Sequence, residues 1–401
     1  MAPLVCAVDV GTTSARAAIM DRTGKLLGRA ECPIAMRRAW PDIAEHDSED
    51  LWRATCQATR AARAAAGVRP EEIAGIAFDA TCSLVIRGRK GETLPLASSE
   101  GRNWDTVVWL DHRAQAEAAE CSATGHTVLN SVGGVMSPEM QIPKLMWLKR
   151  NRPDIWEKTG YLFDLTDFLT WKATYGAERS HCALACKWTF GAGGEAGWNT
   201  GFLDAVGLSD LLARGGLPER TRPVGSDLGP PTPQAAEALG LTTECRVAAG
   251  MIDAYAGALG VLGGHTGKPA GLSRRAALVA GTSSCVMLLS PEPARFAGAW
   301  GPYHGVVLPD IWASEGGQSA TGALLDHIIR WHGEEPDAAM HGKIIARIAE
   351  LRAAEGGEFA ARLHVLPDFH GNRSPHSDPL ALGVISGLAL DPSFDELCRL
   401  Y

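Results

Sequence analysis

No uninterrupted apolar segment of this 401-residue sequence is long enough to cross a membrane, and no positively charged stretch precedes an apolar run at its start. Because both features are missing, we expect neither a membrane protein nor a secretory leader, and we expect a cytoplasmic location. The chain also lacks a long basic run, and its formal net charge is -8. These two properties argue against nucleic acid or an anionic membrane as a partner.

The ten cysteines lack the regular spacing of a disulfide framework, which is typical of reduced, mostly buried thiols. Cys182 and Cys186 lie close together, but no second pair completes the four ligands of a structural zinc site. The P-loop motif Gly-x-x-x-x-Gly-Lys-Ser/Thr is absent as well, since Gly267-Lys268 is followed by Pro269. These absences exclude a disulfide scaffold, a zinc-ribbon fold and a P-loop nucleotide site.

What the sequence does contain is a polar turn directly after its first apolar strand. The segment 4–10 is apolar and rich in β-branched residues, 14–20 alternates well enough to pair with it, and Gly11 lets the backbone turn tightly, so the pattern predicts a β-hairpin. Backbone N–H groups, three hydroxyls and a cation converge there, and such a turn can grip a phosphate. The residues concerned are Asp9, Thr12, Thr13, Ser14 and Arg16, with Asp9 placed to hold the water shell of a Mg²⁺ ion. An ordinary polar β-turn is the alternative.

A second hairpin of the same kind is predicted at 276–289, where apolar strands flank the turn Gly281-Thr-Ser-Ser284. Two similar hairpins this far apart predict two related domains that each present a phosphate loop to a shared cleft, as in the actin-like ATPases. A chance recurrence of a short motif is the alternative. The hydrophobic fraction of 46% and the charged fraction of 21% fit a globular chain with core enough for two domains.

The remaining segments predict an α/β chain. We expect a third strand at 25–30, a helix at 48–65 capped by Asp47 or Ser48, and a buried strand at 73–78 that leads into small polar residues. Further on, the pattern predicts a helix that starts at Ser137-Pro138-Glu139, a strand at 246–249 and a helix at 254–262. The stretch 218–233 is rich in Pro and Gly and indicates a boundary, so we predict domains at 1–245 and 246–401.

Asp253 is the candidate catalytic base. It precedes the predicted helix 254–262, where the helix dipole and free backbone N–H groups keep a carboxylate ionised. Phosphoryl transfer to an alcohol needs one such carboxylate beside the attacking hydroxyl, together with positioning and charge neutralisation. An ordinary helix cap is the alternative, and Asp9 and Glu315 are other carboxylates that could act as the base.

Other polar groups indicate a sugar-like ligand. Trp109 offers a flat apolar face, Asp111 an acceptor and Arg113 a bidentate cation, a mixture that suits the C–H faces and hydroxyls of sugars. Glu315 opens a Gly-rich turn before a predicted helix, and Lys187, in the segment Cys186-Lys-Trp188, is a further polar candidate. Each has an ordinary alternative: Asp111 and Arg113 could form a salt bridge beside a core tryptophan, the Glu315 turn could cap the helix, and Lys187 could be a solvated lysine.

The motifs that carry a resemblance are Asp9-Val-Gly-Thr-Thr-Ser, Phe78-Asp-Ala-Thr-Cys-Ser, Trp109-Leu-Asp-His-Arg, Cys186-Lys-Trp, Gly250-Met-Ile-Asp-Ala-Tyr-Ala-Gly, Ala280-Gly-Thr-Ser-Ser and Glu315-Gly-Gly-Gln-Ser. In this order, they resemble the FGGY family of carbohydrate kinases along the whole chain. The stretch Gly371-Asn-Arg-Ser-Pro375 and the helix expected after Pro138 are most similar to the ribulokinase-type pentulose kinases.

The resemblance implies two actin-like ATPase domains of the ribonuclease H-like kind, with a cleft between them, and ATP-dependent phosphorylation of the terminal hydroxyl of a ketopentose such as ribulose. Asp253 would take the proton from that hydroxyl, and Asp9 would position Mg²⁺ through water. The residues around the ATP phosphates would be Gly11, Thr12, Thr13, Ser14, Arg16, Gly281, Thr282 and Ser283. The sugar pocket would be lined by Ala80, Thr81, Trp109, Asp111, Arg113, Lys187, Asp253 and Glu315.

The chain departs from the family pattern in two places. It matches only the Lys144-Leu-Met-Trp-Leu148 half of the first family signature. Family members also continue, after a segment like 383–401, through a helix and a Gly-Gly-containing loop that holds adenine and ribose, and the sequence contains no such loop. We therefore expect the second domain to be incomplete, and a catalytically impaired sugar- or nucleotide-binding protein is the alternative to a kinase. Homodimer formation stays open.

Overall fold

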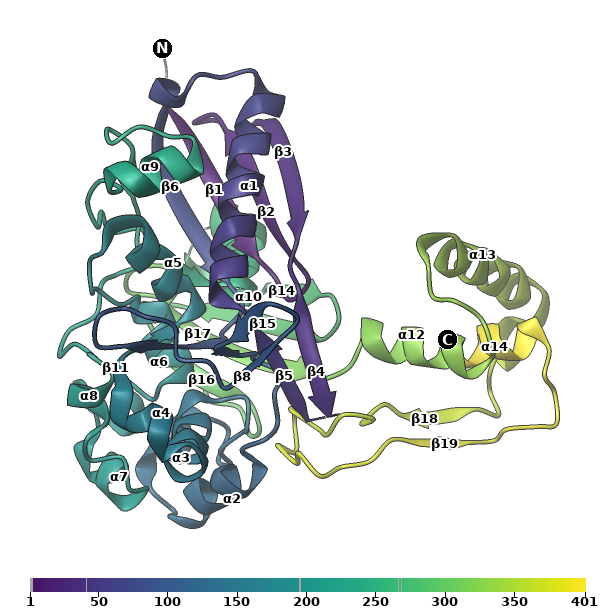
Figure 1. Ribbon diagram of the computed structural model, residues 1–401. Helices are drawn as coiled ribbons and strands as arrows, with labels where there is room; N and C mark the ends of the chain where they lie inside the picture. The colour runs from purple at the N-terminus through teal and green to yellow at the C-terminus, as the bar shows by residue number, and fades with distance from the viewer. Residues whose placement is uncertain (1–2, 41, 195, 266, 268) are drawn as a thin grey trace.

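The computed structural model describes residues 3–40, 42–194, 196–265, 267 and 269–401. Figure 1 shows a large body that carries most of the sheets and helices, and an arm that extends from it to one side. Within the described ranges, no helix combines the length and apolar character that a membrane crossing requires. All ten cysteines are buried, as the scattered spacing predicts.

The first sheet confirms the predicted N-terminal hairpin. Its strand order is β12-β6-β1-β2-β3, with β13 also paired to β6; β1, β2 and β3 run antiparallel, whereas β6 lies parallel to β1. Alternate residues of β1 are buried, so one face of the sheet packs into the core. The strands are β1 (Leu4–Val10), β2 (Ser14–Met20), β3 (Leu26–Pro33), β6 (Ile73–Ala80), β12 (Arg246–Val247) and β13 (Met251–Ile252).

Helix α1 (Ser48–Ala66) covers β2 and β3, and its N-cap is Asp47, whose side chain accepts from the N–H groups of Glu49 and Asp50. This confirms the predicted helix. Strand β6 extends two residues beyond the predicted end at Phe78, because its parallel ladder with β1 continues through Asp79 and Ala80. The strands just after position 245 belong to the first sheet, and the domain boundary expected there stays a prediction.

The second sheet, in the order β11-β7-β10-β5-β4, packs with a group of helices at the lower left of Figure 1. Its strands are β4 (Met36–Trp40), β5 (Ile43–His46), β7 (Leu84–Gly88), β10 (Thr106–Val107) and β11 (Thr159–Asp164), and a separate ribbon pairs β8 (Ala97–Ser99) with β9 (Arg102–Trp104). The other helices of the body are α2 (Gln115–Ala123), α3 (Gln141–Asn151), α4 (Pro153–Lys158), α5 (Leu165–Thr174), α6 (His181–Lys187), α7 (Thr200–Ala205), α8 (Leu211–Arg214), α9 (Pro233–Leu239) and α11 (Pro269–Leu272).

The predicted start of a helix at Ser137 is wrong. Helix α3 begins at Gln141 with Met140 as its N-cap, and 137–140 form a turn in which the Ser137 Oγ accepts from the N–H of Glu139 (3.1 Å). The local turn competes with helix formation for the same backbone donors. Glu139 thus lies in a loop and not on the helix.

The third sheet confirms the second predicted hairpin. Its order is β14-β15-β17-β16, with strands β14 (Ala276–Ala280), β15 (Ser284–Ser290), β16 (Trp300–His304) and β17 (Trp312–Gln318). Glu315 lies within β17 instead of in the predicted turn, because the ladder with β15 continues from Trp312 to Gln318. Helix α10 (Asp253–Leu262) contacts β6 and β13 of the first sheet and β14 and β15 of the third.

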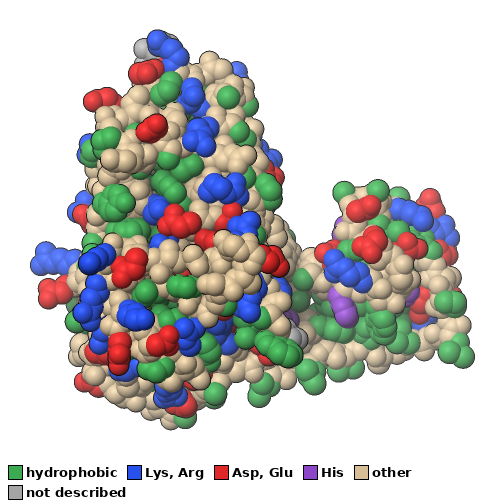
Figure 2. Space-filling model, in the orientation of Figure 1, with side chains coloured by type: hydrophobic (Ala, Val, Ile, Leu, Met, Phe, Trp, Pro, Cys, Tyr) green, Lys and Arg blue, Asp and Glu red, His purple; other side chains and the backbone are tan. Residues whose placement is uncertain are grey.

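The arm carries its own small apolar cluster. It consists of α12 (Gly322–Trp331), α13 (Ala338–Glu355), β18 (His364–Leu366), β19 (Val384–Ser386) and α14 (Phe394–Leu400). Figure 2 shows hydrophobic side chains along its lower edge, where Val365, Leu366 and Val384 are exposed, while charges of both signs mix over the body. The loop between β18 and β19 returns to the body and reaches the cavity described next.

Candidate active site

A cavity of about 550 Å³ lies between the first sheet, α10 and the third sheet. It brings together residues from both predicted phosphate turns, the candidate base and part of the predicted sugar pocket. Thirteen of the predicted site residues line it, namely Asp9, Gly11, Thr12, Thr13, Arg16, Thr81, Trp109, Lys187, Asp253, Gly281, Thr282, Ser283 and Glu315. The four predicted residues that do not line it are Ser14, Ala80, Asp111 and Arg113.

The first turn is closed by the Gly11 N–H, which donates to the carbonyl oxygen of Ser14 (3.0 Å). Trp109 Nε1 donates to Thr12 Oγ1 (3.0 Å), so the turn is tied to the predicted sugar side. Arg16 Nη1 donates to Asp9 Oδ2 (2.9 Å), and this pair stays partly open to solvent. The Ser14 hydroxyl, predicted to face phosphate, instead donates to Glu31 Oε1 (2.6 Å), because β3 brings that carboxylate within reach.

The second turn closes in a similar way, with the Gly281 N–H donating to the carbonyl oxygen of Ser283 (2.8 Å). The start of α12 also holds this turn in place. The Gly322 N–H donates to the carbonyl oxygen of Gly281 (3.0 Å), and the Thr321 N–H donates to the carbonyl oxygen of Thr282 (2.9 Å). A Cβ at Gly322 would lie 2.6 Å from the Gly281 carbonyl oxygen, so only glycine permits this approach.

Asp253 stands at the first position of α10. The N-cap is Ile252, so the predicted capping role is wrong by one residue, although Asp253 Oδ1 accepts from the N–H of Ala254 (2.7 Å). Burial raises the pKa of Asp253 to about 6, helped by the negative charges of Asp9 and Glu315 and opposed by the Ala254 N–H and by Lys187. A carboxylate with this pKa is ionised at neutral pH and can accept a proton.

Asp79 is a site residue that sequence reasoning missed. It lies beside Asp9 in the parallel ladder, and burial, together with the charges of Asp9 and Asp253, raises its pKa well above the ordinary value. This crowding of carboxylates fits a cation. In the part of the chain that the structure describes, no group of three His, Cys, Asp or Glu side chains is arranged as a metal site. Mg²⁺ needs no such group, because it is held by one or two carboxylates together with substrate phosphates and water.

The end of the cavity that is predicted to bind sugar is built from buried charges. Lys187 Nζ lies 3.4 Å from Glu315 Oε2 and 3.9 Å from the centre of the Trp300 ring, and Tyr255 donates its hydroxyl hydrogen to the same Glu315 oxygen (3.0 Å). Burial is the largest influence on Lys187 and lowers its pKa, but Glu315, Cys82 and Glu139 together outweigh burial and raise the pKa. Lys187 therefore stays charged, and the predicted solvated lysine is excluded.

Asp111 and Arg113 do not reach this end. Asp111 Oδ2 accepts from the Ala44 N–H (2.7 Å), and Arg113 Nη2 is shared between Asp111 (2.7 Å) and Glu45 (2.8 Å). Their charges are thus satisfied by one another and by Glu45, which β5 brings alongside. The geometry gives no support for sugar contacts by this pair.

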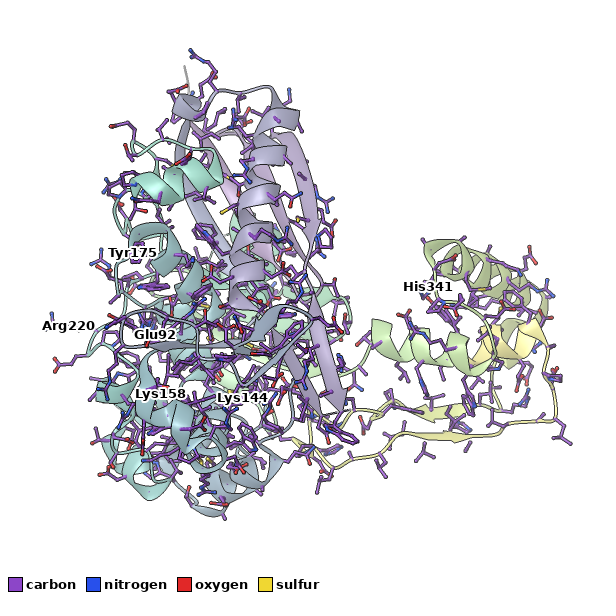
Figure 3. All side chains as sticks on the ribbon, in the orientation of Figure 1. Glu92, Lys144, Lys158, Tyr175, Arg220 and His341 are labelled. Carbon is purple, nitrogen blue, oxygen red and sulfur yellow. The ribbon has the colours of Figure 1, made fainter. Side chains whose placement is uncertain are left out.

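Ala80 is fully buried in β6 between two paired strands and also faces away from the cavity. Lys144, labelled in Figure 3, donates to the carbonyl oxygens of Val108 and Trp109 (3.0 Å each) and so fixes the loop that places the Trp109 ring at the cavity. This gives the matched half of the sequence signature a structural role.

Comparison with known proteins decides the family. The model of the FGGY carbohydrate kinase N-terminal domain matches residues 4–260, and that of the C-terminal domain matches residues 276–401. The chain belongs to the FGGY family of carbohydrate kinases. It is 42% identical to a human FGGY carbohydrate kinase domain-containing protein, over 98% of this chain and 74% of that protein. It is 37% identical to a D-ribulokinase of Saccharomyces cerevisiae, over 98% of this chain and 61% of that protein.

Solved structures of the family share the fold. The chain is similar to a ligand-bound xylulose kinase from Lactobacillus acidophilus with a TM-score of 0.79 at 18% identity, and to a xylulose kinase from Rhodospirillum rubrum with 0.74 at 23% identity. Each likeness covers 99% of this chain and 75% of the other. The kinase therefore has the two-domain actin-like ATPase fold, and the family match does not favour the predicted alternative of a protein that only binds.

Two further residues of the kinase cavity were missed from the sequence. Glu139 and Arg373 line it and form a buried ion pair of 2.8 Å. Arg373 lies in the quoted stretch 371–375, and that motif was the available signal. No sequence signal marked Glu139, because its ion-pair partner lies 234 positions away in the chain.

Proposed function

We propose that this kinase transfers the γ-phosphoryl group of ATP to the terminal hydroxyl of a ketopentose such as ribulose. The observation that carries the proposal is the position of Asp253 in a cavity that has two phosphate-type turns and a buried Lys187–Glu315 pair. The D-ribulokinase name of the yeast relative supports ribulose as the first sugar to test.

Asp253 acts as the general base in this proposal. Its carboxylate accepts the proton of the sugar hydroxyl as that oxygen attacks phosphorus, and the bridging oxygen leaves with ADP. The pKa of about 6 keeps most of the base ionised at neutral pH. Lys187 and Glu315 then have to orient the other hydroxyls so that the terminal one faces Asp253.

The two Gly-Thr turns grip the phosphates with backbone N–H groups and hydroxyls. Arg16 can leave the partly exposed Asp9 for a phosphate oxygen at low cost, because a pair open to solvent is weak. Asp9 and Asp79 are the residues that would hold Mg²⁺, which supplies charge neutralisation on the transferring group when bound. Closure of the two domains around the cavity excludes water and so limits idle ATP hydrolysis.

An assay of ADP release with a panel of ketopentoses and pentitols tests the proposal. We expect sugar-dependent release by the wild-type protein and its loss in Asp253→Asn. Asp227→Asn is the matched control, because Asp227 forms an exposed surface pair with Arg246. ADP release that no sugar stimulates would contradict the proposal. The cytoplasmic location, the homodimer and the use of ATP with Mg²⁺ stay predictions.

A further inference from the structure

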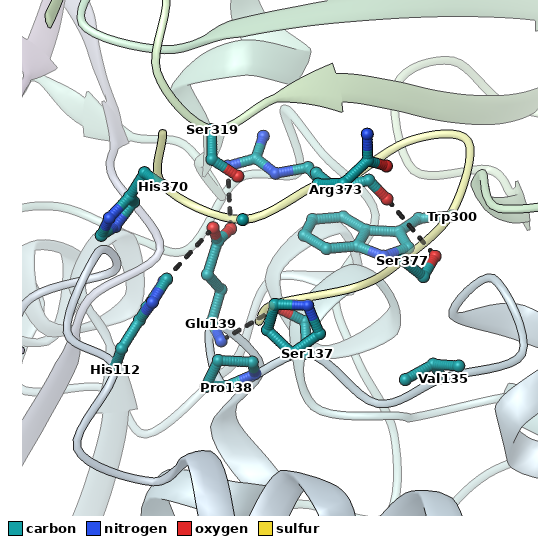
Figure 4. A pocket seen from close by; sticks show the side chains of 13 residues that line it. His112, Val135, Ser137, Pro138, Glu139, Trp300, Ser319, His370, Arg373 and Ser377 are labelled. Atoms are coloured by element: carbon teal, nitrogen blue, oxygen red, sulfur yellow. Dashed lines mark hydrogen bonds and ion pairs between the residues drawn. The ribbon is translucent and has the colours of Figure 1, made fainter. Parts of the chain in front are cut away.

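A buried ion pair joins the two family domains at the wall of the cavity. Glu139 lies in the loop before α3, and Arg373 lies in the loop between β18 and β19; Arg373 Nη2 donates to Glu139 Oε2 at 2.8 Å. Figure 4 shows Glu139 between Arg373 and His112, whose Nε2 is 3.7 Å from Glu139 Oε1. The two side chains are only 5% and 6% exposed. Burying such a pair costs desolvation, so it is weak evidence for stability and calls for another role.

The same guanidinium also faces the sugar end. Arg373 Nη1 lies 3.3 Å from Cys285 Sγ and 3.9 Å from Glu315 Oε1, and its plane packs near the rings of Trp300 (5.2 Å) and Trp109 (5.8 Å). One fork therefore reaches Glu139 of the first domain and Glu315 of the second. Lys187 approaches the other oxygen of Glu315, so cations and carboxylates alternate along this wall.

The backbone around Arg373 is anchored to the third sheet. Ser374 Oγ accepts from the Gly317 N–H (3.2 Å) and donates to the carbonyl oxygen of Gly298 (2.8 Å). Gly317 of β17 leaves room for the side chain, because a Cβ there would lie 2.8 Å from Arg373 Nη1 and 3.0 Å from Cδ. The backbone of Arg373 is thus held by the second family domain, while its guanidinium group reaches Glu139 of the first.

We propose that Arg373 is a positioning residue for sugar binding, which fixes the Glu315 carboxylate and ties it to Glu139 of the opposite domain. Glu315 Oε2 is held by Tyr255 and Lys187, and Oε1 is oriented by Cys285 and Arg373. Without Arg373, Glu315 keeps its contacts on the Lys187 side and loses the fork that aims its other oxygen. Asp253 has no contact with this fork, so the chemical step is spared.

The test separates sugar affinity from chemistry and rests on the proposed function for its choice of sugar. The ketopentose is titrated calorimetrically into the full chain without nucleotide, and kcat and the two KM values are measured. In Arg373→Ala the charged hydrogen bond to Glu139 and the 3.9 Å ion pair with Glu315 are both lost, and we expect the sugar Kd and KM to rise about 10- to 100-fold. The KM for ATP and kcat change little. In Arg373→Lys the charge remains but the fork is lost, so an intermediate sugar affinity is expected.

Glu139→Gln keeps the shape of the side chain but removes its charge, and we expect the sugar Kd to rise in this variant too. If Arg373→Ala does not fold, Glu139→Gln and Arg373→Lys decide the question. Arg347→Ala is the matched control, because Arg347 forks to Asp395 (2.7 and 2.9 Å) in the arm. An unchanged sugar Kd, or equal losses for sugar and ATP, would overturn the inference. If the wild type shows no sugar-dependent ADP release, the proposed function itself fails.

Discussion

The two ends of the cavity are built differently. At the end proposed to bind phosphate, Arg16 and Asp9 form a pair whose side chains are more than a third exposed. At the end proposed to bind sugar, Lys187 and Glu315 are at most 5% exposed, and further donors surround the Glu315 carboxylate. An exposed pair is worth about 1 kcal/mol or less, whereas removing one partner of a buried pair costs about 3 to 5 kcal/mol. If the proposed assignment holds, the exposed Arg16–Asp9 pair can exchange partners when a phosphate binds, whereas the buried Lys187–Glu315 pair is already oriented before a sugar binds.

The largest expected effect is the loss of kcat when the proposed base, Asp253, is replaced, because this change alters the chemical step and leaves the binding of sugar and phosphate in place. Asp253→Asn keeps the size of the side chain but removes the base, so kcat falls by about 100- to 10,000-fold while the sugar Kd changes little. Steady-state kinetics and sugar titration measure the two quantities. A variant that keeps wild-type kcat would show that another group takes the proton.

The comparison of the two ends is tested by removing one carboxylate from the buried pair and one that lies beside the exposed pair. Glu315→Gln leaves Lys187 and Arg373 short of a buried partner, and we expect the free energy of unfolding to fall by about 3 kcal/mol. Glu31→Gln removes a carboxylate beside Arg16 that is open to solvent, and no measurable change is expected. Urea denaturation of the two variants provides the measurement. Equal destabilisation would contradict the distinction between the ends.

The second phosphate turn is probed by adding one methyl group behind it. In Gly322→Ala the new Cβ would meet the Gly281 carbonyl oxygen at 2.6 Å, so the turn has to shift and overpacking costs about 1 to 3 kcal/mol. We expect the KM for ATP to rise more than the KM for sugar. Gly342→Ala is the control, because Gly342 lies inside α13 with open space around it, and alanine there favours the helix. An unchanged KM for ATP in Gly322→Ala would remove this turn from the phosphate site.

The smallest expected effect is a pH dependence. The pKa of Asp253 is raised to about 6, and the ionised form is the active one, so kcat is full above this pH and is lost as the pH falls through it. A plot of log kcat against pH should fall with unit slope below about 6. The fraction of folded protein is measured in the same samples, so that a loss of kcat through acid unfolding is not mistaken for protonation of Asp253. A kcat that stays constant down to pH 4.5 or so would exclude Asp253 as the titrating base.

Local patterns predicted the fold well. Apolar runs and a Gly-containing turn determine each hairpin over about a dozen residues, so both hairpins were predicted correctly. The start of a predicted helix also drew attention to Asp253, which lines the cavity, while its role as the base stays a prediction. What the local patterns could not show depends on distant partners. Asp111 and Arg113 look free in the sequence but lie outside the cavity, where Arg113 meets Glu45, and Glu139 of the first family domain meets Arg373 of the second. Pairing across such separations is not encoded in local periodicity.

The central claim is tested most directly by the identity of the product. Wild-type protein, ATP, Mg²⁺ and ribulose are incubated together, and the phosphorus NMR spectrum is recorded with proton coupling. We predict a phosphate monoester signal split into a triplet by the two protons of a terminal CH₂ group, absent when Asp253→Asn replaces the wild type. A doublet from a secondary carbon, or inorganic phosphate alone, would contradict the account.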